Sequence, residues 1–285
     1  MSGLVACVPA GHSGLVMDAA LLRRETGGRE GLSVVIITRN EAPRIGPCLQ
    51  SAGFADEVIV VDAHSEDGTA DLCRKHGARV FERSWTGYGD QKNFAMAQAR
   101  QPWVMILDAD ERVPDALRKE VEEVLRAGGE PGAVAYRIPR RNYFYGRWVR
   151  HGGLFPDYQI RLLRRGAGRY NDASLHENLL VDGPVGTLRH ALDHETEQTL
   201  ADHFRRVDRY TTLAARETGR RCRRVGWTHL TLRPAVTFFK MSILKGGFRD
   251  GVPGLLVCTF AAMHTFLKYV KLWEERLGPP ARGKP

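Results

Sequence analysis

Residues 103–110, WVMILDAD, give the strongest indication of the fold in this chain. Five apolar residues precede two aspartates one residue apart, Asp108 and Asp110, so two carboxylates are expected at the tip of a buried strand. Carboxylate oxygens suit a hard divalent cation such as Mg²⁺ or Mn²⁺. Such a cation can hold a diphosphate and neutralise its charge as it leaves. Aspartate pairs also occur in ordinary loops, so the surrounding sequence has to decide.

Apolar runs alternate with helical patterns through the first half of the chain. Strands are predicted at residues 33–38, 58–61, 78–81 and 103–107. Several are apolar at consecutive positions, as expected when helices cover both faces of a sheet. Helices are predicted at residues 43–52, 69–76, 91–100 and 114–127, the last with Pro114 at its first position. This order predicts an α/β fold with a mainly parallel, Rossmann-like sheet flanked by helices.

Polar clusters follow three of the predicted strands. They are residues 38–41 (TRNE), residues 62–69 (DAHSEDGT) and residues 108–111 (DADE). Ligands bind at the carboxyl ends of strands in open α/β sheets. Three acidic clusters on that edge would repel one another unless they share a cation or contact a ligand. Each cluster also has a structural interpretation, since Ser65 can cap the next helix and Glu41 can complement a helix dipole. Their convergence favours a nucleotide and metal site.

These residues, in this order, resemble glycosyltransferase family 2, which has the GT-A fold. The resemblance is carried by residues 33–41 (SVVIITRNE), 60–69 (VVDAHSEDGT) and 107–112 (LDADER). Within the family the chain is most similar to lipopolysaccharide core β-glucosyltransferases that add glucose to the inner-core heptose. That likeness rests on GYGDQKN (87–93), YQIRLLRR (158–165), LHE (175–177) and RYTT (209–212), and spans roughly residues 32–275.

The resemblance implies a role for each matching residue. The nucleotide sugar is bound by Thr38, Asn40, Glu41, Asp62, Ser65, Lys92 and Asp108. Within that set, Asp62 reads the uracil ring and Asp108 contacts the ribose or the metal. Asp110 binds the Mg²⁺ or Mn²⁺ that bridges the two phosphates. His194 is a further candidate metal ligand, with a phosphate contact or a structural role as alternatives.

The resemblance also implies an inverting reaction. Glu177 occupies the place of a general base that takes the proton of the acceptor hydroxyl. The alternative is that His176 and Glu177 form a loop pair that binds backbone amides. Arg161 and Arg164 are candidates for gripping an anionic acceptor through their planar guanidinium groups.

The amino-acid composition limits the kinds of partner that we expect this protein to bind. The chain of 285 residues has 42 Lys or Arg against 33 Asp or Glu, a net charge of +9. Residues 202–250 contain 12 Arg or Lys and only 4 Asp or Glu. This excess of positive charge indicates an anionic partner or a basic surface exposed to solvent. No zinc-finger spacing or aromatic-basic RNA motif is present, so we expect no nucleic acid partner. The five scattered cysteines fit a reducing, cytoplasmic compartment.

The C-terminal third differs in character from the rest. Residues 251–267 contain no Asp, Glu, Lys or Arg, and Lys268 and Lys271 follow. This length is near the lower limit of a membrane span. We expect a helical appendage lying on an anionic membrane, on the inner face of the cytoplasmic membrane, where a lipid-anchored saccharide would be the acceptor. The alternative is a pair of core helices packed on the catalytic domain or on a second subunit.

The sequence thus predicts three parts: a variable extension (1–31), a GT-A catalytic domain (32–200) and a basic, apolar helical region (201–285). The leading hypothesis is a metal-dependent transfer of a hexose, with UDP-glucose as the expected donor, to the lipopolysaccharide inner core. A polyprenyl phosphate, capsular or other glycan acceptor is the first alternative. A nucleotidyltransferase is less favoured, because residues 38–41 are not the glycine-rich loop that cradles a triphosphate.

Overall fold

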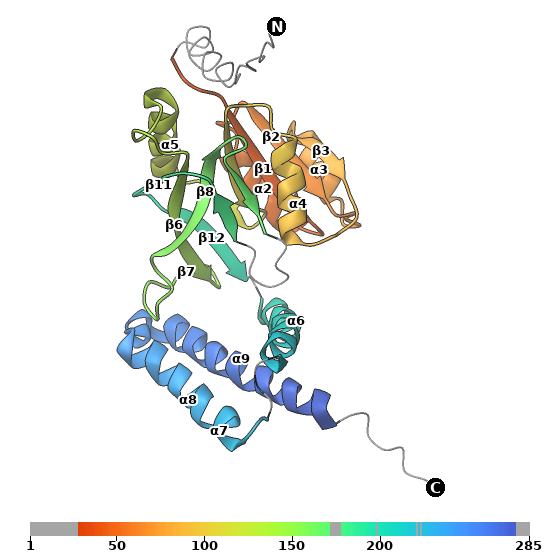
Figure 1. Ribbon diagram of the computed structural model, residues 1–285, viewed down its shortest axis with the longest axis vertical. Coiled ribbons are helices and arrows are strands. Elements are labelled where there is room, and N and C mark those ends of the chain that lie inside the picture. The colour runs from red at the N-terminus through yellow and green to blue at the C-terminus, as the bar shows by residue number, and fades with distance from the viewer. Residues whose placement is uncertain (1–27, 172–177, 198, 221, 223, 278–285) are drawn as a thin grey trace, which may run out of the picture.

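The computed structural model describes residues 28–171, 178–197, 199–220, 222 and 224–277 (Figure 1). A mixed sheet with flanking helices forms one part, and a group of helices that follows it in sequence forms the other. The strands are β1 (Leu32–Thr38), β2 (Glu57–Asp62), β3 (Arg79–Glu82), β4 (Trp103–Asp108), β5 (Glu111–Arg112), β6 (Ala135–Phe144), β7 (Arg147–Trp148), β8 (Asp157–Arg164), β9 (Gly168–Tyr170), β10 (Leu179–Val181), β11 (Val185–Thr187) and β12 (Leu192–Glu197).

The main sheet has the order β3-β2-β1-β4-β8-β6-β12-β5, and β7 and β11 pair with β6. The first four strands of this order are parallel to one another. β8 runs antiparallel to both β4 and β6, while β12 runs parallel to β6. The carboxyl ends of β1, β2 and β4 therefore share one edge, as the sequence predicted. The predicted fold class, an α/β sheet of mostly parallel strands flanked by helices, is confirmed.

Helices cover both faces of the parallel half of the sheet. They are α2 (Ala42–Ser51), α3 (Thr69–Lys75), α4 (Tyr88–Ala97) and α5 (Asp115–Ala127). Alternate residues of β1 serve two cores: Val34 and Ile36 pack with α2 and α5, whereas Val35 and Ile37 pack with α4. Burial of β1 on both faces explains its continuous apolar sequence.

Several predicted helix boundaries differ from the structure by one to three residues, and two of these differences concern how a helix begins. The helix expected at residues 91–100 is α4, which begins three residues earlier, directly after Gly87 with φ +130°, a conformation that favours glycine. Pro114 is the cap before α5, not its first helical residue, because its ψ of 157° is extended. Gly77 and Gly128 do adopt positive φ after α3 and α5, as expected for helix ends.

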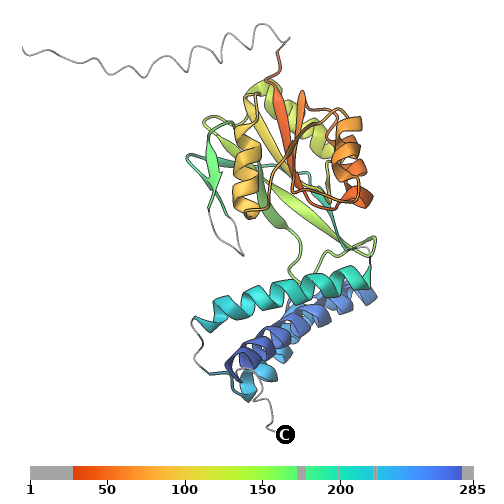
Figure 2. The same cartoon turned by 90° about the vertical axis from the view of Figure 1, so that its right-hand side faces the viewer.

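The C-terminal helices form a separate layer beneath the sheet. They are α6 (Leu200–Gly219), α7 (Trp227–Leu230), α8 (Leu232–Phe239), a π-helical turn η1 (Lys240–Leu244), a 3₁₀ turn η2 (Gly247–Asp250) and α9 (Gly251–Leu277). α6 follows β12 and packs along α9 (Figure 2). The division of the chain into an extension, a catalytic domain and a C-terminal region stays a prediction.

Two polar contacts hold this layer in place. His151, in the loop after β7, bonds through Nδ1 to Asp250 Oδ1 at 2.7 Å. The Lys271 ammonium of α9 donates to Asp208 Oδ1 of α6 at 2.7 Å. The first contact connects the C-terminal helices to the sheet, and the second connects two of the helices to each other.

Candidate active site

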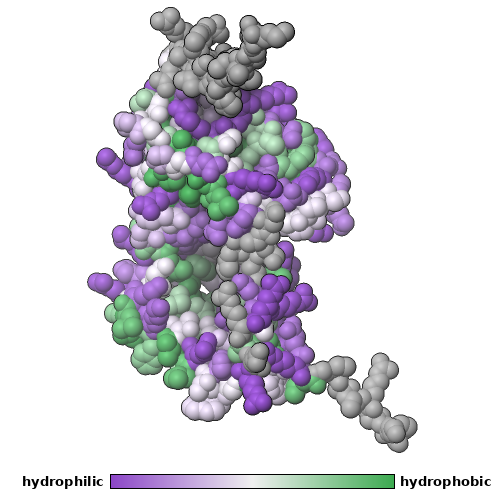
Figure 3. Space-filling model, viewed as in Figure 1, coloured by the Kyte–Doolittle hydropathy of each residue, from purple (hydrophilic) through white to green (hydrophobic). Residues whose placement is uncertain are grey.

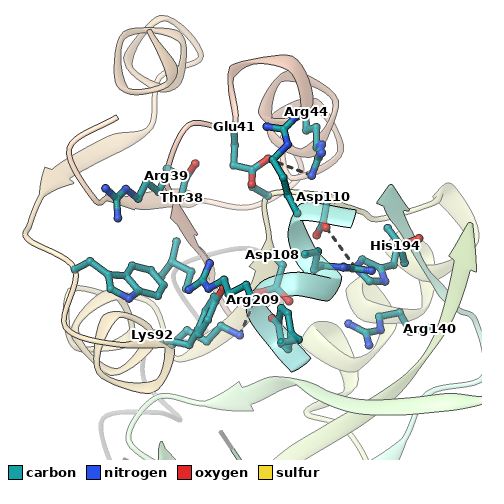
Figure 4. Close-up of a pocket in the computed structure, with 18 residues that line it drawn as sticks. Thr38, Arg39, Glu41, Arg44, Lys92, Asp108, Asp110, Arg140, His194 and Arg209 are labelled. Carbon is teal, nitrogen blue, oxygen red and sulfur yellow. Dashed lines mark ion pairs between the residues drawn. The ribbon is translucent and has the colours of Figure 1, made fainter. Parts of the chain in front are cut away.

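A cavity of about 740 Å³ opens at the carboxyl edge of β1 and β4, where α6 passes in front of the sheet (Figure 4). Its lining is strongly basic, with seven Arg or Lys against three Asp or Glu, an excess of four positive charges. The lining residues are Ile37, Thr38, Arg39, Glu41, Arg44, Trp85, Tyr88, Lys92, Asp108, Ala109, Asp110, Arg140, His194, Thr196, Arg205, Arg206, Arg209 and Tyr210. Such a cavity suits an anionic ligand.

The loops after β1 and β2 are tied together beside the cavity. The N–H of Asn40 donates to Ser65 Oγ at 2.8 Å, and Asn40 Oδ1 accepts from the N–H of Glu66 at 2.9 Å. The N–H of Glu41 donates to Thr69 Oγ1 at 2.9 Å. Asn40 has φ +56°, a left-handed conformation that asparagine tolerates better than most residues. In this structure Asn40 and Ser65 therefore shape the loops.

Asp62 lies beneath these loops and outside the cavity lining. It is 1% exposed, and its two oxygens accept the N–H of Ser65 at 2.7 Å and the hydroxyl of Ser65 at 2.5 Å. Its predicted contact with a uracil ring stays a prediction. Thr38, by contrast, lines the cavity, and its buried hydroxyl has no hydrogen-bond partner in the described part of the chain. A ligand group would satisfy that hydroxyl.

A network of charged residues, which we call the floor network, forms the base of the cavity: Lys92, Asp108, Glu111, Arg140 and Arg161. Asp108 Oδ1 lies 3.1 Å from Lys92 Nζ, and Asp108 Oδ2 lies 2.5 Å from an Arg161 nitrogen. The same Arg161 nitrogen lies 2.5 Å from Glu111 Oε1, which Arg140 also contacts at 3.3 Å. Burial works to raise the pKa of Asp108, but the charges of Arg161 and Lys92 outweigh it and hold that pKa far below its ordinary value.

Asp110 has different surroundings, although it lies only two residues from Asp108. It lines the cavity, and its Oδ2 is 3.4 Å from Nε2 of His194 (Figure 4). The other ring nitrogen of His194, Nδ1, is 2.7 Å from Asn142 Oδ1. Asn142 in turn donates through Nδ2 to the carbonyl oxygen of Leu154 at 3.1 Å. That bond orients the amide, so His194 Nδ1 carries a proton and Nε2 is left to face Asp110.

Asp110 and His194 fit a divalent metal better than Asp108 does. An imidazole nitrogen and a carboxylate oxygen that face one another across 3.4 Å are both of the atom types that bind divalent metals. The described residues contain no group of three or more His, Cys, Asp or Glu that could hold a metal ion. Mg²⁺ commonly takes one or two protein ligands and completes its shell with substrate phosphates and water, and Asp108 is already occupied by two cations.

The two predicted acceptor arginines lie in different places, and neither lines the cavity. Arg161 is buried in the floor network. Arg164 pairs in register with Trp103, at the start of β4 and therefore at the opposite end of that strand from Asp108. There the Arg164 guanidinium stacks on the Trp103 ring at 4.6 Å and lies 3.4 Å from Glu30. Glu177, the predicted base, lies outside the described residues.

The α6 wall of the cavity is absent from the site residues predicted from the sequence. Arg205, Arg206, Arg209 and Tyr210 line it. Their spacing places them on one face of a helix, a signal that was present in the sequence. Two aromatic residues, Trp85 and Tyr88, were missed as well, and their rings meet edge to face at 4.7 Å.

A basic cavity at the carboxyl edge of a mostly parallel sheet, with a carboxylate and a histidine facing each other in it, lies where proteins with open α/β sheets bind their ligands. Glycosyl transferase family 2 matches residues 33–217, and the chain belongs to this family. It is 32% identical over 250 residues to the lipopolysaccharide core biosynthesis glycosyltransferase LpsC of Rhizobium meliloti (strain 1021), covering 85% of this chain and 92% of that protein.

Two further likenesses are more distant. An uncharacterized glycosyltransferase, RC0292, of Rickettsia conorii (strain ATCC VR-613 / Malish 7) is 26% identical over 260 residues, which cover 87% of this chain and 92% of that protein. Among solved structures, S. aureus TarS 1–349 in complex with UDP-GlcNAc has a TM-score of 0.45 and 15% identity, covering 88% of this chain and 93% of that one.

Proposed function

We propose that this glycosyltransferase transfers a hexose from a UDP-sugar, with UDP-glucose as the expected donor, to a lipopolysaccharide inner-core saccharide. The reaction would depend on Mg²⁺ or Mn²⁺ and invert the anomeric centre. The observation that carries the proposal is the meeting of Asp110, His194, Lys92 and Thr38 in one basic cavity at the carboxyl edge of the sheet. The name of the R. meliloti relative supports the acceptor.

The donor would lie along the strand ends. Thr38 and Glu41, on the β1 side of the cavity, would contact the nucleoside, and the unsatisfied Thr38 hydroxyl supplies a hydrogen bond there. Asp110 and His194 would hold the metal, which when bound neutralises the charge that develops on the departing diphosphate. Lys92 is 7% exposed and paired with Asp108, so it adds fixed positive charge beneath the phosphates.

Inversion requires a base on the face of the sugar opposite the diphosphate. We retain Glu177 for this role, on the motif LHE at residues 175–177. A carboxylate there would accept the proton of the acceptor hydroxyl as the oxygen bonds to the anomeric carbon and the bond to UDP breaks. An α-linked donor would then give a β-glycoside.

Membrane association belongs to the same proposal. Exposed apolar side chains, which we call the apolar belt, gather on α8, η1, η2 and the start of α9: Leu232, Val236, Phe239, Ile243, Leu244, Phe248, Val252 and Leu255. Figure 3 shows hydrophobic surface over these elements. Exposed Lys240, Lys245 and Arg249 lie within this segment. Asp250, the one carboxylate in residues 232–263, is held by His151. Apolar side chains with basic neighbours suit an anionic bilayer surface.

Residues 247–277 form a stretch of helix long and apolar enough to cross a membrane, by length and composition alone. Its contacts favour a position on the surface. Tyr269 and Leu272 pack on Ala215 of α6, and Lys271 bonds to Asp208 of the same helix. α6 also lines the basic cavity. A helix fastened to a polar, cavity-lining helix is better placed at the interface than inside the hydrocarbon.

The first test is UDP release from UDP-glucose with Mn²⁺ or Mg²⁺ and heptose-terminated, truncated lipopolysaccharide. We expect acceptor-dependent release in the wild type and in the control Asp182→Ala, which alters an exposed turn residue. Asp110→Ala and Glu177→Ala should abolish it. Release retained in Glu177→Ala alone would keep the reaction and move the base to another residue. No binding of any UDP-sugar would refute the proposal.

The second test measures sedimentation with vesicles of phosphatidylglycerol and phosphatidylcholine. The double variant Phe239→Glu with Leu244→Glu places two charges in the apolar belt, and we expect binding to weaken at least about tenfold. The control Leu180→Glu alters an apolar residue that is 60% exposed in β10, outside the belt. Equal sedimentation of the double variant and the wild type would argue against the membrane contact and for packing against a protein.

A further inference from the structure

A second cavity, of about 630 Å³, lies between the sheet and the C-terminal helices. One side is the β6–β7 hairpin, which contributes Phe144, Tyr145 and Arg147, and the other is the junction of η2 and α9, which contributes residues 250–253 and Leu256. Figure 1 shows this end of β6 and β7 directed toward the C-terminal helices. We call this cavity the hairpin pocket. It shares no residue with the candidate active site, and its volume is typical of a small-molecule site.

Hydrogen bonds fasten the two sides of the hairpin pocket to each other. The Asp250 carboxylate accepts the N–H of His151 through Oδ2 at 2.7 Å, and its Oδ1 lies 2.7 Å from Nδ1 of the same histidine. The N–H of Gly152 donates to the carbonyl oxygen of Lys245 at 2.9 Å. These bonds hold the sheet and the C-terminal helices at a fixed separation. A pocket with fixed walls costs a ligand little conformational entropy.

The side chains of the pocket combine apolar surface with one exposed cation. Phe144, Pro253 and Leu256 contribute apolar surface. Asp250 is the one carboxylate in the lining, and its side chain is 8% exposed and held by His151. Arg147 is exposed and makes no ion pair with the residues that the structure describes. This arrangement matches a ligand that has a hydrocarbon chain and a single negatively charged group.

The hairpin pocket is continuous with the apolar belt. Val252 belongs to both and is 69% exposed, and Phe248, in the preceding turn η2, is 60% exposed. A lipid chain can therefore pass from the belt into the pocket while its methylene groups stay covered by apolar side chains. Lys245 and Arg249 lie in the same segment and are exposed, so the lipids that gather at this surface are anionic ones.

We propose that the hairpin pocket binds one anionic phospholipid, with an acyl chain against Phe144 and Leu256 and the phosphate group at Arg147. The inference rests on the membrane association in the proposed function, to which it adds a specific lipid site. Arg140 of the active-site cavity and Phe144 of the pocket lie four residues apart on β6, a distance of about 13 Å at the rise of a strand. A lipid bound here fixes the position of the active-site cavity relative to the bilayer.

The test uses the full chain and short-chain lipids that remain monomeric in solution, so that no bilayer takes part. Isothermal titration compares dihexanoyl phosphatidylglycerol, dihexanoyl phosphatidylcholine and glycerol 3-phosphate. We expect one phosphatidylglycerol molecule per chain, bound about fivefold more tightly than phosphatidylcholine, because Arg147 meets its net charge. Glycerol 3-phosphate lacks the acyl chains and should bind at least about tenfold more weakly than phosphatidylglycerol.

Substitutions at two residues of the pocket separate the chain from the headgroup. Leu256→Trp fills the pocket and should weaken phosphatidylglycerol binding about tenfold or more. The matched control Leu255→Trp alters the neighbouring residue, which is 49% exposed and does not line the pocket, and should bind like the wild type. Arg147→Gln should remove the preference for phosphatidylglycerol over phosphatidylcholine. Arg189→Gln, at an exposed arginine outside the pocket, should keep that preference.

Three results would overturn the inference. They are equal binding of phosphatidylglycerol and glycerol 3-phosphate, equal affinity in Leu255→Trp and Leu256→Trp, and a wild type that sediments with vesicles but binds no monomeric lipid. The last result would leave the membrane association intact. A wild type that binds neither vesicles nor monomeric lipid would refute the membrane association as well. UDP release in solution does not involve the pocket, so it tests the transfer reaction separately.

Discussion

The floor and the α6 wall of the cavity are both rich in arginine, yet Arg161 of the floor and Arg209 of the wall have opposite surroundings. In the floor, Arg161 is 5% exposed and contacts two carboxylates at 2.5 Å. On the wall, Arg209 is exposed, and its partner is the Tyr88 ring, with no carboxylate against it in the described chain. Matched charges hold a protein's own shape, whereas unmatched charge at a cavity is available to a ligand. The exposure of an arginine side chain and the identity of its partner therefore distinguish a structural arginine from one that can bind a ligand.

The largest effect should follow from Arg161→Met. The substitution leaves Asp108 and Glu111 with one cation fewer, and breaking a buried ion pair on one side costs about 3–5 kcal/mol of unfolding free energy. Urea unfolding followed by circular dichroism measures this. Arg118→Met provides the control, because Arg118 is half exposed and pairs with Glu122 one turn away. It should cost about 0.5 kcal/mol or less. Similar losses of unfolding free energy in the two variants would mean that the buried ion pairs of the floor stabilise the protein no more than a surface ion pair does.

Substitution of Asp110 should reduce the stability of the protein less than Arg161→Met does, but it should greatly reduce turnover. Asp110→Asn removes a carboxylate that lines the cavity and faces only His194 among the described residues. Transfer should fall by about 100-fold or more, with little change in Tm. Asp108→Asn should lower both, since it breaks contacts to Lys92 and Arg161. If both variants were equally stable, the contrast between floor and cavity would fail.

Asn142 offers a sharper probe of the proposed metal site, because its side chain contacts His194 and does not line the cavity. Asn142→Leu removes the oxygen that accepts a hydrogen bond from Nδ1 of His194 and orients the ring. Substituting a residue that orients a metal ligand typically changes metal affinity about 10–100-fold. Asn142→Asp keeps an acceptor and should stay near the wild type. The readout is the Mn²⁺ concentration that half-saturates UDP binding. Equal values in both variants would assign His194 a purely structural role.

The smallest effect is the pH dependence of the floor. The pKa of Asp108 is held low by Arg161 and Lys92 against the opposing effect of burial, so below the ordinary carboxyl pKa the unfolded chain binds the proton more readily. The stability that Asp108 contributes is thus complete above about pH 4 and is lost as the pH falls further. The difference in unfolding free energy between wild type and Asp108→Asn should be constant from about pH 8 to 5. A difference that shrinks between pH 7 and 5 would contradict this pairing.

Much of the sheet could be predicted because its signals are local. Val34, Val35, Ile36 and Ile37 form an apolar run that reads as a strand buried on both faces, and the carboxyl ends of such strands determine where polar clusters meet. Asp110 was accordingly placed at this edge from the order of the strands, whereas Lys92 was assigned to the same site by the family resemblance. Both residues line the cavity.

Partners distant in sequence could not be predicted in this way. Arg161 lies about 50 residues after Asp108, and only the antiparallel return of β8 beside β4 shows that it is buried under that aspartate. Arg164, three residues later, lies at the other end of the same strand pair and cannot share its role. For α6, the basic excess was visible in the sequence, but which arginines face the cavity depends on how the helix packs on α9.

The hydrogen bonds between the loops after β1 and β2 have a thermodynamic consequence. The amides of Asn40 and Glu41 already donate to side chains of the other loop, and so does the Glu66 amide in return. The edge of the cavity that these loops form is therefore preorganised, and a ligand that binds there has little backbone entropy to remove. Two short polar segments determine the conformation of this edge, which does not depend on a bound ligand.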